Sequence, residues 1–416
     1  MRGAVGEKMD AVILAAGEGT RMRPLTSTRP KPMLPVAGKP ILEWDLEALY
    51  GNGFERVFIV VGYKKDSIIR YFGNRFNDME IEYIIQKEQL GTAHAVSISE
   101  KKVKNRFLVM NGDLLVSDKL IKKFLEDNKN HNAKNSISLV RVKNPSEFGI
   151  VNLKGNIINS IIEKPERSNS NLANAGIYVF NDEIFDAIRD VEKSTRAEYE
   201  ITDAIKILID KSDVYGFEVE DRWIDIGRPW DLLDANEIML KDMEMRIDDG
   251  AKIEENAIIK GNVYIGKESV VRSGAYIEGP VYIGKNCIIG PNCYIRKYSM
   301  IMDNSHIGNA VEIKNSIIMQ KTNICHLSYV GDSIIGERCN LGAGTNIANL
   351  RVDNEDVRIE IKNKLTKSGR RKFGCLMGDA VKTGINVSIM PGRSIYPGAY
   401  VEAGSVVRNT IYKEGD

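Results

Sequence analysis

The first half of the chain takes its architecture from one short stretch, Ala11-Val12-Ile13-Leu14-Ala15-Ala16-Gly17-Glu18-Gly19-Thr20-Arg21. Its continuous apolar part, bounded by glycines, is typical of a buried parallel strand. In α/β sheets such a strand delivers the following loop to the ligand crevice at its carboxyl end. Gly17 and Gly19 let the backbone approach a phosphate chain, and Arg21 and Lys31 bring positive charge to the same place.

The stretch matches neither of the two common phosphate-binding fingerprints. No Gly-Lys-Ser/Thr follows it, and Met22 stands where a dinucleotide-binding fold needs its third glycine. The helix that both motifs require is prevented by the prolines of the next segment, namely Pro24, Pro30, Pro32 and Pro35. We therefore expect this loop to wrap a nucleotide as an extended lid.

Length and composition describe an ordinary globular protein. A chain of 416 residues is longer than a single hydrophobic core usually accommodates, so we expect two domains. A formal net charge of +1 gives no electrostatic case for nucleic acid or membrane as a partner, and no apolar run approaches the ~20 residues of a membrane helix. The first residues lack the apolar region of a secretory leader. The five cysteines form no C-x-x-C pair, so we expect reduced thiols in a cytoplasmic protein.

Up to about residue 227, apolar runs alternate with helical patterns, which predicts a mostly parallel sheet with helices on both faces. The expected strands cover residues 57–61, 107–110, 136–142 and 177–180, and the expected helices cover 42–49, 120–128 and 201–209. Pro229 is suited to a helix start, and we expect a connecting helix from Trp230 to Met245.

From about residue 248 the sequence repeats with a period of six. Branched apolar residues, mostly isoleucine, occupy every sixth position from Ile253 to Ile313. The pattern slips by one residue, resumes at Ile318 and again at Ile335, and returns at Ile389. A solenoid whose short strands each point one such residue inward produces this period.

The six-residue period breaks between about Leu350 and Lys372, in an insert that carries eight lysines and arginines from Arg351 to Lys372. Insertions in solenoids collect on one face, which is often the binding face. The composition fits a solvated loop equally well.

With both halves considered, the chain resembles the bifunctional enzymes that make UDP-N-acetylglucosamine. These enzymes join a glucosamine-1-phosphate N-acetyltransferase to an N-acetylglucosamine-1-phosphate uridylyltransferase. The resemblance rests on L-A-A-G-x-G-T-R with Lys31-Pro32, and on these further motifs: Gln89-Leu90-Gly91-Thr92-Ala93-His94-Ala95, Asn111-Gly112-Asp113, Glu163-Lys164-Pro165, Asn174-Ala175-Gly176, Trp223-Ile224-Asp225-Ile226-Gly227, His326-Leu327-Ser328-Tyr329-Val330-Gly331-Asp332 and Gly342-Ala343-Gly344-Thr345.

The resemblance implies an architecture and a set of ligands. A Rossmann-like nucleotidyltransferase domain is expected over residues 1–228, a linker helix over 229–247, and a left-handed parallel β-helix acetyltransferase domain, which trimerises, over 248–416. The implied substrates are an amino sugar 1-phosphate, UTP and acetyl-CoA, with Mg²⁺ as cofactor. The chain is more similar to archaeal relatives, some of which accept galactosamine-1-phosphate or thymidine nucleotides, so the breadth of sugar and base stays open.

Nucleotidyl transfer joins two anions, so its site needs cations and a metal more than covalent chemistry. Asp113 ends one apolar strand and Asp225 follows another, which predicts two carboxylates suited to Mg²⁺ at the carboxyl edge of the sheet. Taken alone, Asp113 is better explained as a turn former after Gly112, but together with Asp225 and the opening loop it favours a metal site. Relatives often carry Asn where Asp225 stands, whereas thymidylyltransferase relatives carry Asp, which weakens the prediction of the nucleotide.

By resemblance, Arg21 and Lys31 are the catalytic cations that hold the phosphates. The implied nucleotide-binding residues are Gly17, Gly19, Thr20, Gln86, Gly91, Thr92 and Gly112. The residues implied to contact the sugar and its phosphate are Gly149, Glu163, Lys164 and Asn174.

Acetyl transfer requires a sugar amine that has lost its proton, and His326 is the natural base because imidazole has a pKa of about 6.5. A lone histidine on a solenoid edge is also a common packing residue. Consecutive strand residues face opposite sides, so Cys325 and His326 should not share a groove. Direct attack on acetyl-CoA is therefore favoured over an acyl-enzyme.

By resemblance, Arg296 and Lys314 hold the sugar phosphate at the acetyl-transfer site. The sugar pocket is shaped by Tyr329, Asn340 and Asn349, and the acetyl-CoA groove is lined by Ala343, Lys372 and Ala403. The chain departs from bacterial members in having Leu350 in place of a tyrosine after Asn349, and in its longer insert.

Two other functions compete with the bifunctional enzyme. One is a nucleotidyltransferase alone, using glucose-1-phosphate with dTTP or UTP, or mannose-1-phosphate with GTP, whose β-helix is structural or regulatory. The other is a non-catalytic scaffold. His326 and Tyr329 argue against the first, and the intact set of Arg21, Lys31, Asp113 and Asp225 argues against the second.

Overall fold

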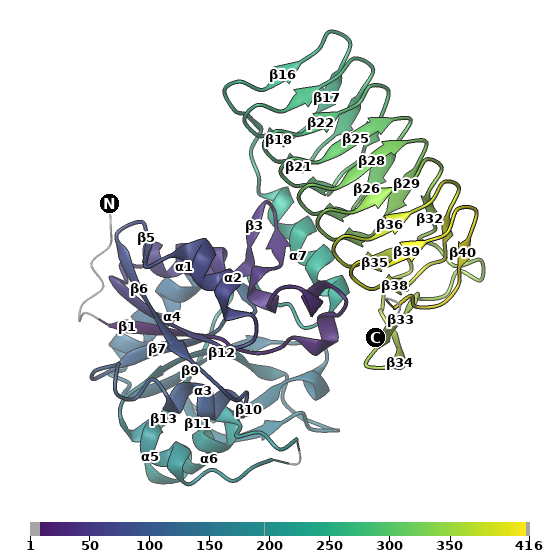
Figure 1. Ribbon diagram of the computed structural model, residues 1–416. Helices are drawn as coiled ribbons and strands as arrows, with labels where there is room; N and C mark the ends of the chain where they lie inside the picture. Colours follow the sequence, from purple (N-terminus) through teal and green to yellow (C-terminus); the bar gives the residue numbers. More distant parts are fainter. Residues whose placement is uncertain (1–8, 195, 413–416) are drawn as a thin grey trace. The chain divides into compact units, whose positions relative to one another are not determined.

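The computed structural model describes residues 9–412, residue 195 excepted (Figure 1). The chain forms two compact units, and the main division falls after Asp225. Two early segments, Gly19–Arg29 and Leu34–Pro40, pack with the second unit and not with the first. Sequence periodicity contains no signal for this exchange, because it depends on contacts with residues more than 200 positions away.

The first unit is built on a ten-stranded mixed sheet. Its strands, in spatial order, are β10 (Gly149–Lys154), β11 (Ile157–Glu163), β13 (Val214–Glu218), β9 (Asn135–Arg141), β12 (Leu172–Phe180), β7 (Phe107–Asn111), β1 (Asp10–Ala15), β4 (Arg56–Val61), β6 (Met79–Ile85) and β5 (Arg75–Phe76). Strands β7, β1, β4 and β6 pair in parallel, as expected of apolar runs buried on both faces.

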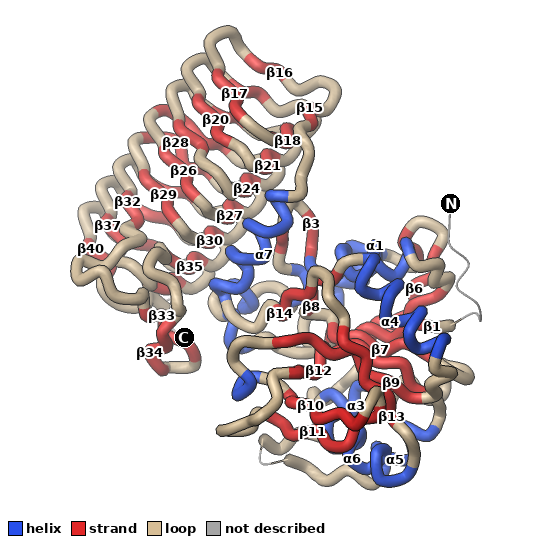
Figure 2. Tube along the Cα trace, turned by 180° about the vertical axis from the view of Figure 1, so that it is seen from behind, coloured by secondary structure: helices blue, strands red, loops and turns tan. Residues whose placement is uncertain are grey.

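Different helices cover the two faces of this sheet (Figure 2). Their buried side chains belong to two separate apolar layers. One layer includes buried residues of α1 (Ile41–Gly51), α2 (Lys65–Phe72) and α4 (Asp118–Asn130). The other includes residues of α3 (Thr92–Ser97), α5 (Glu183–Arg189) and α6 (Ile201–Lys211). The predicted sheet with helices on both faces is confirmed, and each expected strand and helix is present.

The segment after β1 is compact, so the predicted extended lid is wrong. It folds into three short 3-10 turns, η1 (Thr20–Met22), η2 (Leu25–Ser27) and η3 (Lys31–Met33), followed by a small hairpin of β2 (Pro35–Val36) and β3 (Lys39–Pro40). The prolines do exclude an α-helix here. They are compatible with single 3-10 turns, because such turns need few backbone donors and Pro fixes φ near helical values.

The second unit contains three parallel sheets of eight short strands each. The first sheet consists of β15 (Arg246–Ile247), β18 (Val263–Ile265), β21 (Val281–Ile283), β24 (Met300–Ile301), β27 (Ile317–Ile318), β30 (Ile334–Ile335), β35 (Cys375–Met377) and β38 (Arg393–Ile395). The second consists of β16 (Lys252–Ile253), β19 (Val270–Val271), β22 (Ile288–Ile289), β25 (His306–Asn309), β28 (Asn323–His326), β31 (Asn340–Leu341), β36 (Lys382–Thr383) and β39 (Tyr400–Val401). The third consists of β17 (Ile258–Lys260), β20 (Tyr276–Glu278), β23 (Tyr294–Ile295), β26 (Glu312–Lys314), β29 (Tyr329–Gly331), β32 (Asn346–Ile347), β37 (Ser388–Ile389) and β40 (Val406–Val407).

Each coil of this solenoid contributes one strand to each sheet, as the stacked strands of Figures 1 and 2 show. From Ile265 onward the repeated branched residues point inward and are almost fully buried, whereas Ile253 in the first coil is exposed. In the early coils Ile265 pairs with Ile283, so a coil takes 18 residues, or three hexads. Ile301 pairs with Ile318, so the coil there is one residue shorter, which explains the slip in the period. The fold is the predicted parallel β-helix.

Three further elements complete the chain. The connecting helix α7 (Pro229–Lys241) ends at Lys241 and not at Met245, because the chain turns there to enter β15. The basic insert is an ordered antiparallel hairpin, β33 (Arg358–Ile361) with β34 (Lys364–Lys367), anchored by the buried Val357 and Ile359. A two-stranded sheet of β8 (Leu114–Val116) and β14 (Trp223–Asp225) closes the first unit.

All five cysteines are free, and four of them are buried as predicted, whereas Cys325 is only half-buried. Within residues 9–412, residue 195 aside, we find no helix with the length and apolarity that crossing a membrane demands.

Candidate functional site

The two predicted metal-binding carboxylates lie in neighbouring segments of the first unit, Asp113 just before β8 and Asp225 on its partner strand β14. Asp113 follows β7, and Asp225 ends β14, where it pairs in register with Leu114. We expected Asp225 at the carboxyl edge of the main sheet, but it lies on the small two-stranded sheet. That sheet still brings it beside Asp113. Lys31 Nζ lies 2.7 Å from Asp113 Oδ2. Two adjacent carboxylates, one of them partly exposed, fit a Mg²⁺ ion whose other ligands are phosphate oxygens.

Gly112 allows this arrangement. Its amide donates a hydrogen bond to the carbonyl of Leu14, and an added Cβ would lie 3.0 Å from that oxygen. A larger residue would push β7 away from the end of β1. There the chain enters the L-A-A-G-x-G-T-R motif (residues 14–21), which we call the signature segment, and its turn η1 the signature turn.

A further carboxyl group, buried within reach of the charge of Asp113, was not predicted from the sequence. Asp45, on α1, is fully buried, and neither of its oxygens has a hydrogen-bond partner among the described residues. Burial raises the pKa of Asp45 well above its ordinary value, and the charge of Asp113 raises it further. Its helical pattern alone assigns this position to the core, where a carboxyl group is unexpected.

The predicted base-binding residues form a hydrogen-bonded group at the start of α3. Gln86 is buried, and its Nε2 donates to the carbonyl of Gly91 at 3.3 Å and contacts His94 Nδ1 at 2.9 Å. Gly91 has φ +109, and a Cβ there would overlap the backbone of Tyr199. Thr92 Oγ1 accepts a hydrogen bond from the amide of Ile201 at the start of α6, so this hydroxyl also has a structural role.

Three of the predicted sugar-contacting residues meet at one point. Gly149 pairs with Glu163 across β10 and β11, and a Cβ on Gly149 would lie 3.1 Å from Glu163 Oε2 and 3.7 Å from Asn174 Cβ. Asn174 lies at an irregularity in the pairing of β12 with β9, a feature typical of strands beside active sites. Lys164 follows the end of β11, and its Nζ lies 3.6 Å from Glu163 Oε1.

The other signature residues belong to the second unit. Gly19 precedes η1 with φ 63, Thr20 begins that turn, and Arg21 is exposed. The segment is held by Arg29, whose guanidinium donates to Glu337 and, at 2.5 Å, to Asp379. Burial acts to lower the pKa of Arg29, but the two carboxylates outweigh it and raise the pKa.

At the acetyl-transfer end, the predicted sugar-phosphate residues gather around one unpredicted residue, Asp332. This side chain is buried, and its carboxylate accepts hydrogen bonds from Lys314 Nζ at 2.9 Å, Asn315 Nδ2 at 2.8 Å and Asn349 Nδ2 at 2.5 Å. Asn349 also lies 3.1 Å from the hydroxyl of Tyr329. Asp332 was part of the motif that carried the resemblance, but a charged residue at a coil corner has no periodic signal.

Two arginines extend this group, whereas Lys372 was predicted for acetyl-CoA and not for the sugar phosphate. Arg296 pairs with Glu312 at 2.8 Å on the same sheet, and this hydrogen bond raises the pKa of Arg296. In the insert, Arg370 is largely buried, pairs with Asp234 on α7, and lies 3.9 Å from Asp332. Lys372 is exposed, so Arg370 is the insert cation beside the predicted sugar-phosphate residues.

His326 lies on a corner of the solenoid shared with the two predicted acetyl-CoA residues. It ends β28 and is exposed, and its carbonyl accepts a hydrogen bond from Gly344. In the next coil the carbonyl of Ala343 accepts from Asn386, and Ala403 occupies the same corner two coils further on. Tyr329 starts the strand that follows His326, so this corner leads directly to the Asp332 group. Asn340, in β31, lies on the sheet before the corner and does not join that group.

Cys325 contacts a different histidine. Its Sγ lies 3.5 Å from His306 Nδ1. Burial raises the pKa of Cys325 and lowers that of His306, so both groups are neutral near pH 7 and do not form a thiolate–imidazolium pair.

Comparisons with known proteins agree with both parts of this description. Residues 10–242 match the family model described as nucleotidyl transferase, and residues 277–368 match the model described as the GMPPB C-terminal domain. The bifunctional protein GlmU of Methanococcus vannielii is 46% identical over 98% of this chain and 96% of its own length. The chain belongs to the GlmU family.

Another relative and one solved structure extend the comparison. A protein of Sulfurisphaera tokodaii named bifunctional sugar-1-phosphate nucleotidylyltransferase/acetyltransferase is 41% identical over 97% of this chain and 98% of its own. A UDP-glucose pyrophosphorylase crystallised with UDP-glucose has a TM-score of 0.53 at 24% identity, and the match covers 56% of this chain and 99% of that one. The latter shows the fold of the first part alone. The predicted family, fold class and enzyme class are thereby confirmed.

Proposed function

We propose that this protein acetylates glucosamine-1-phosphate with acetyl-CoA and then transfers UMP from UTP to the N-acetylglucosamine-1-phosphate, with release of pyrophosphate. The observation that carries the proposal is near full-length similarity to relatives named as bifunctional, which leaves neither half of the chain without a counterpart. We assign the first activity to residues 248–416 and the second to residues 1–228, with residues 229–247 as linker.

In nucleotidyl transfer, the phosphate of the sugar attacks the α-phosphorus of UTP and pyrophosphate leaves. Lys31 and Arg21 hold the phosphate oxygens. In the free protein Lys31 Nζ already lies 2.7 Å from Asp113 Oδ2, so it is positioned beside the carboxylates. Asp113 and Asp225 would hold Mg²⁺, which neutralises the charge on the triphosphate. Glu163, Lys164 and Asn174 orient the sugar phosphate, while Gln86 and Thr92 receive the base.

In acetyl transfer, the amine nitrogen attacks the thioester carbonyl, a C–N bond forms, and coenzyme A leaves as a thiol. His326 accepts the proton that the amine loses. Lys314, Arg296 and Arg370 supply positive charge for the sugar phosphate, and Tyr329 and Asn349 line the sugar pocket. The corner row of His326, Ala343 and Ala403 gives the pantetheine arm a path with small side chains. The neutral state of Cys325 supports direct attack over an acyl-enzyme.

We also propose that the β-helix forms a homotrimer in the cytoplasm. Exposed apolar side chains gather on two adjoining sheets and the corner between them, namely Leu327, Ile385, Tyr400 and Val406. A second copy of the chain is the natural cover for such side chains. Free cysteines suit a reducing compartment.

One experiment separates the two activities. The protein is incubated with glucosamine-1-phosphate, acetyl-CoA, UTP and Mg²⁺, and free thiol and pyrophosphate are followed separately. His326→Ala should abolish thiol release alone, and Asp113→Ala should abolish pyrophosphate release from pre-acetylated sugar alone. Matched controls are His306→Ala and the exposed Asp213→Ala, which should retain both activities.

The alternative, a nucleotidyltransferase with a structural β-helix, predicts pyrophosphate release with no thiol release in the unmodified protein. If either single substitution silenced both activities in a folded protein, the assignment to separate sites would be wrong.

A further inference from the structure

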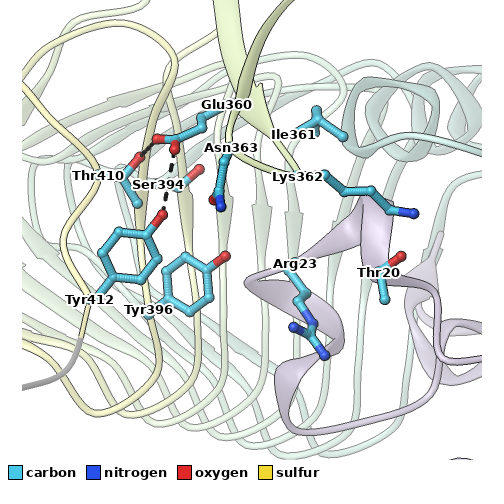
Figure 3. Close-up of a pocket in the computed structure, with 10 residues that line it drawn as sticks. All are labelled: Thr20, Arg23, Glu360, Ile361, Lys362, Asn363, Ser394, Tyr396, Thr410 and Tyr412. Carbon is cyan, nitrogen blue, oxygen red and sulfur yellow. Dashed lines mark hydrogen bonds between the residues drawn. The ribbon is translucent and has the colours of Figure 1, made fainter. Parts of the chain in front are cut away.

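A cavity of about 180 Å³ lies in the second unit, and of the site residues named above its lining includes Thr20 (Figure 3). Three separate segments line it: the signature turn with Thr20 and Arg23, the insert hairpin from Glu360 to Asn363, and the last coils with Ser394, Tyr396, Thr410 and Tyr412. None of the functions assigned so far uses these last two segments. The convergence of three distant segments on one cavity is typical of a binding site.

One wall of the cavity is fixed by its own contacts. Glu360 accepts hydrogen bonds from Thr410 at 2.5 Å and from Tyr412 at 3.5 Å, the two drawn in Figure 3. The rings of Tyr396 and Tyr412 pack with their centroids 4.6 Å apart. The carboxylate is thus held on the side of the two hydroxyls, and the two tyrosine rings, tilted by 35° to each other, form an aromatic surface beside it.

The other wall is cationic. Arg23 and Lys362 lie together with Thr20 on the side away from Glu360 (Figure 3). Burial raises the pKa of Tyr396, and the positive charge of Arg23 partly offsets this rise. Two cations and a hydroxyl are a combination that binds a phosphate group, because each contributes a charge-assisted or direct hydrogen bond to its oxygens.

Neutral polar groups lie between the two walls. The hydroxyl of Ser394 is buried and has no hydrogen-bond partner among the described residues, which is costly unless a ligand or water supplies one. The amide of Asn363 points into the same space (Figure 3). Such groups suit a ligand rich in hydroxyls, and the small volume suits a ligand smaller than the usual drug-sized molecule.

We propose that this cavity binds a sugar phosphate, with the phosphate on Arg23 and Lys362 and the sugar hydroxyls on Ser394 and Asn363. Because the lining includes the turn that carries Arg21, the bound ligand also holds that turn and lowers the KM for UTP. Only this kinetic consequence rests on the proposed function. The binding itself does not.

The binding test uses glucose 6-phosphate, which has no phosphate at C1 to act as a nucleotidyl acceptor, and isothermal titration calorimetry on the full chain. Lys362→Gln and Ser394→Ala should each weaken binding about tenfold. Lys364→Gln, on the next strand and outside the cavity, is the matched control and should bind as the unmodified protein does. Inorganic phosphate should bind more weakly, and glucose should not bind measurably.

Two outcomes would overturn the proposal. Equal affinity in the unmodified protein, Lys362→Gln and Ser394→Ala would mean that the cavity is not the site. Binding lost in Lys164→Ala or Lys314→Ala would mean that the probe occupies a substrate site. Pyrophosphate release assayed with and without glucose 6-phosphate tests the kinetic part, and a lower KM for UTP that disappears in Lys362→Gln supports it. If thiol and pyrophosphate were not released at all, the proposed function would fail while the calorimetric result stood.

Discussion

At the residue scale, the buried Asp45 lowers the free energy of unfolding at neutral pH. Burial and the charge of Asp113 raise its pKa, so the folded state favours the protonated form. In the unfolded chain the same carboxyl group loses its proton near pH 3.9. Stability from this group is therefore fully present below about pH 4 and is lost as the pH rises towards the raised pKa of Asp45.

We expect Asp45→Asn to stabilise the protein at neutral pH, by about 1–3 kcal/mol, because it removes a buried unpartnered carboxyl group. Thermal unfolding measured from pH 4 to pH 8 should show a gap between variant and unmodified protein that opens as the pH rises. A gap that is constant over this range, or one that closes at high pH, would contradict the explanation.

Asp332 has the opposite role, because it is paired. Asp332→Asn should leave Lys314 without its carboxylate and raise the KM for the amino sugar phosphate about tenfold in the thiol-release assay. Pyrophosphate release from pre-acetylated sugar should not change. The matched control is Asp353→Asn, an exposed ion pair with Arg351 in the insert, where we expect no measurable effect. Equal effects of the two substitutions on the KM would exclude a positioning role for Asp332.

The family resemblance, more than residue type, grouped the residues of the acetyl-transfer pocket, and their roles stay predictions. Lys314, Tyr329 and Asn349 were predicted for one pocket, and the structure brings them together. Asp332 and Asp45 were missed for a physical reason. A buried charge is defined by its partners or by their absence, and those come from distant parts of the chain.

At the scale of elements, the signature segment depends on Arg29. The side chains of Arg29, Glu337 and Asp379 are 12%, 13% and 6% exposed, so the ion pairs are largely shielded from water. Thr28 also donates to Asp379, at 2.8 Å. The turn that carries Arg21 is thus attached to the solenoid by a short, nearly buried network.

We expect Arg29→Ala to destabilise the protein by about 3–5 kcal/mol, because it removes the buried cation of two largely buried carboxylates and leaves them the exposed Arg338. It should also raise the KM for UTP while thiol release stays unchanged. Arg338 lies beside the same two carboxylates but is 55% exposed, so Arg338→Ala is the matched control, with an expected loss of at most about 1 kcal/mol. Urea unfolding of both variants checks the comparison, and equal losses would mean that burial of Arg29 contributes nothing. Arg29→Lys should restore part of the affinity for UTP.

Elements with a strong period were predicted well, and those without one were not. The hexads located the solenoid strands because each inward residue repeats, and even the slip at Ile318 corresponds to a shortened coil. The insert left two interpretations open, and it is an ordered hairpin whose stability depends on the buried Val357 and Ile359. The prolines excluded a helix after β1 but did not specify 3-10 turns, since η1 and η2 pack with the second unit and η3 packs with the first.

At the scale of the whole molecule, the exchange of Gly19–Arg29 and Leu34–Pro40 makes the second unit discontinuous in sequence. We expect a fragment of residues 1–228 to release no pyrophosphate, because its signature turn lacks Glu337 and Asp379. Adding residues 229–416 as a separate chain should restore part of the activity. Activity of the first fragment alone, equal to that of the full chain, would show that the turn holds its shape without these partners.

Domain count and fold class were predictable because each half has its own period. The assignment of residues 19–29 and 34–40 to the second unit was not, since it depends on ion pairs across more than 300 positions, such as Arg29 with Asp379.

The discontinuity bears on how genes of this kind can recombine. A hybrid joined near residue 228 inherits Arg29 from one parent and the positions of Glu337 and Asp379 from the other. Such a chimera stays intact only when the donor of the downstream portion supplies acidic side chains at both places. An exchange of solenoids among these proteins is therefore constrained by Arg29, whose codon lies about 300 codons before those of Glu337 and Asp379.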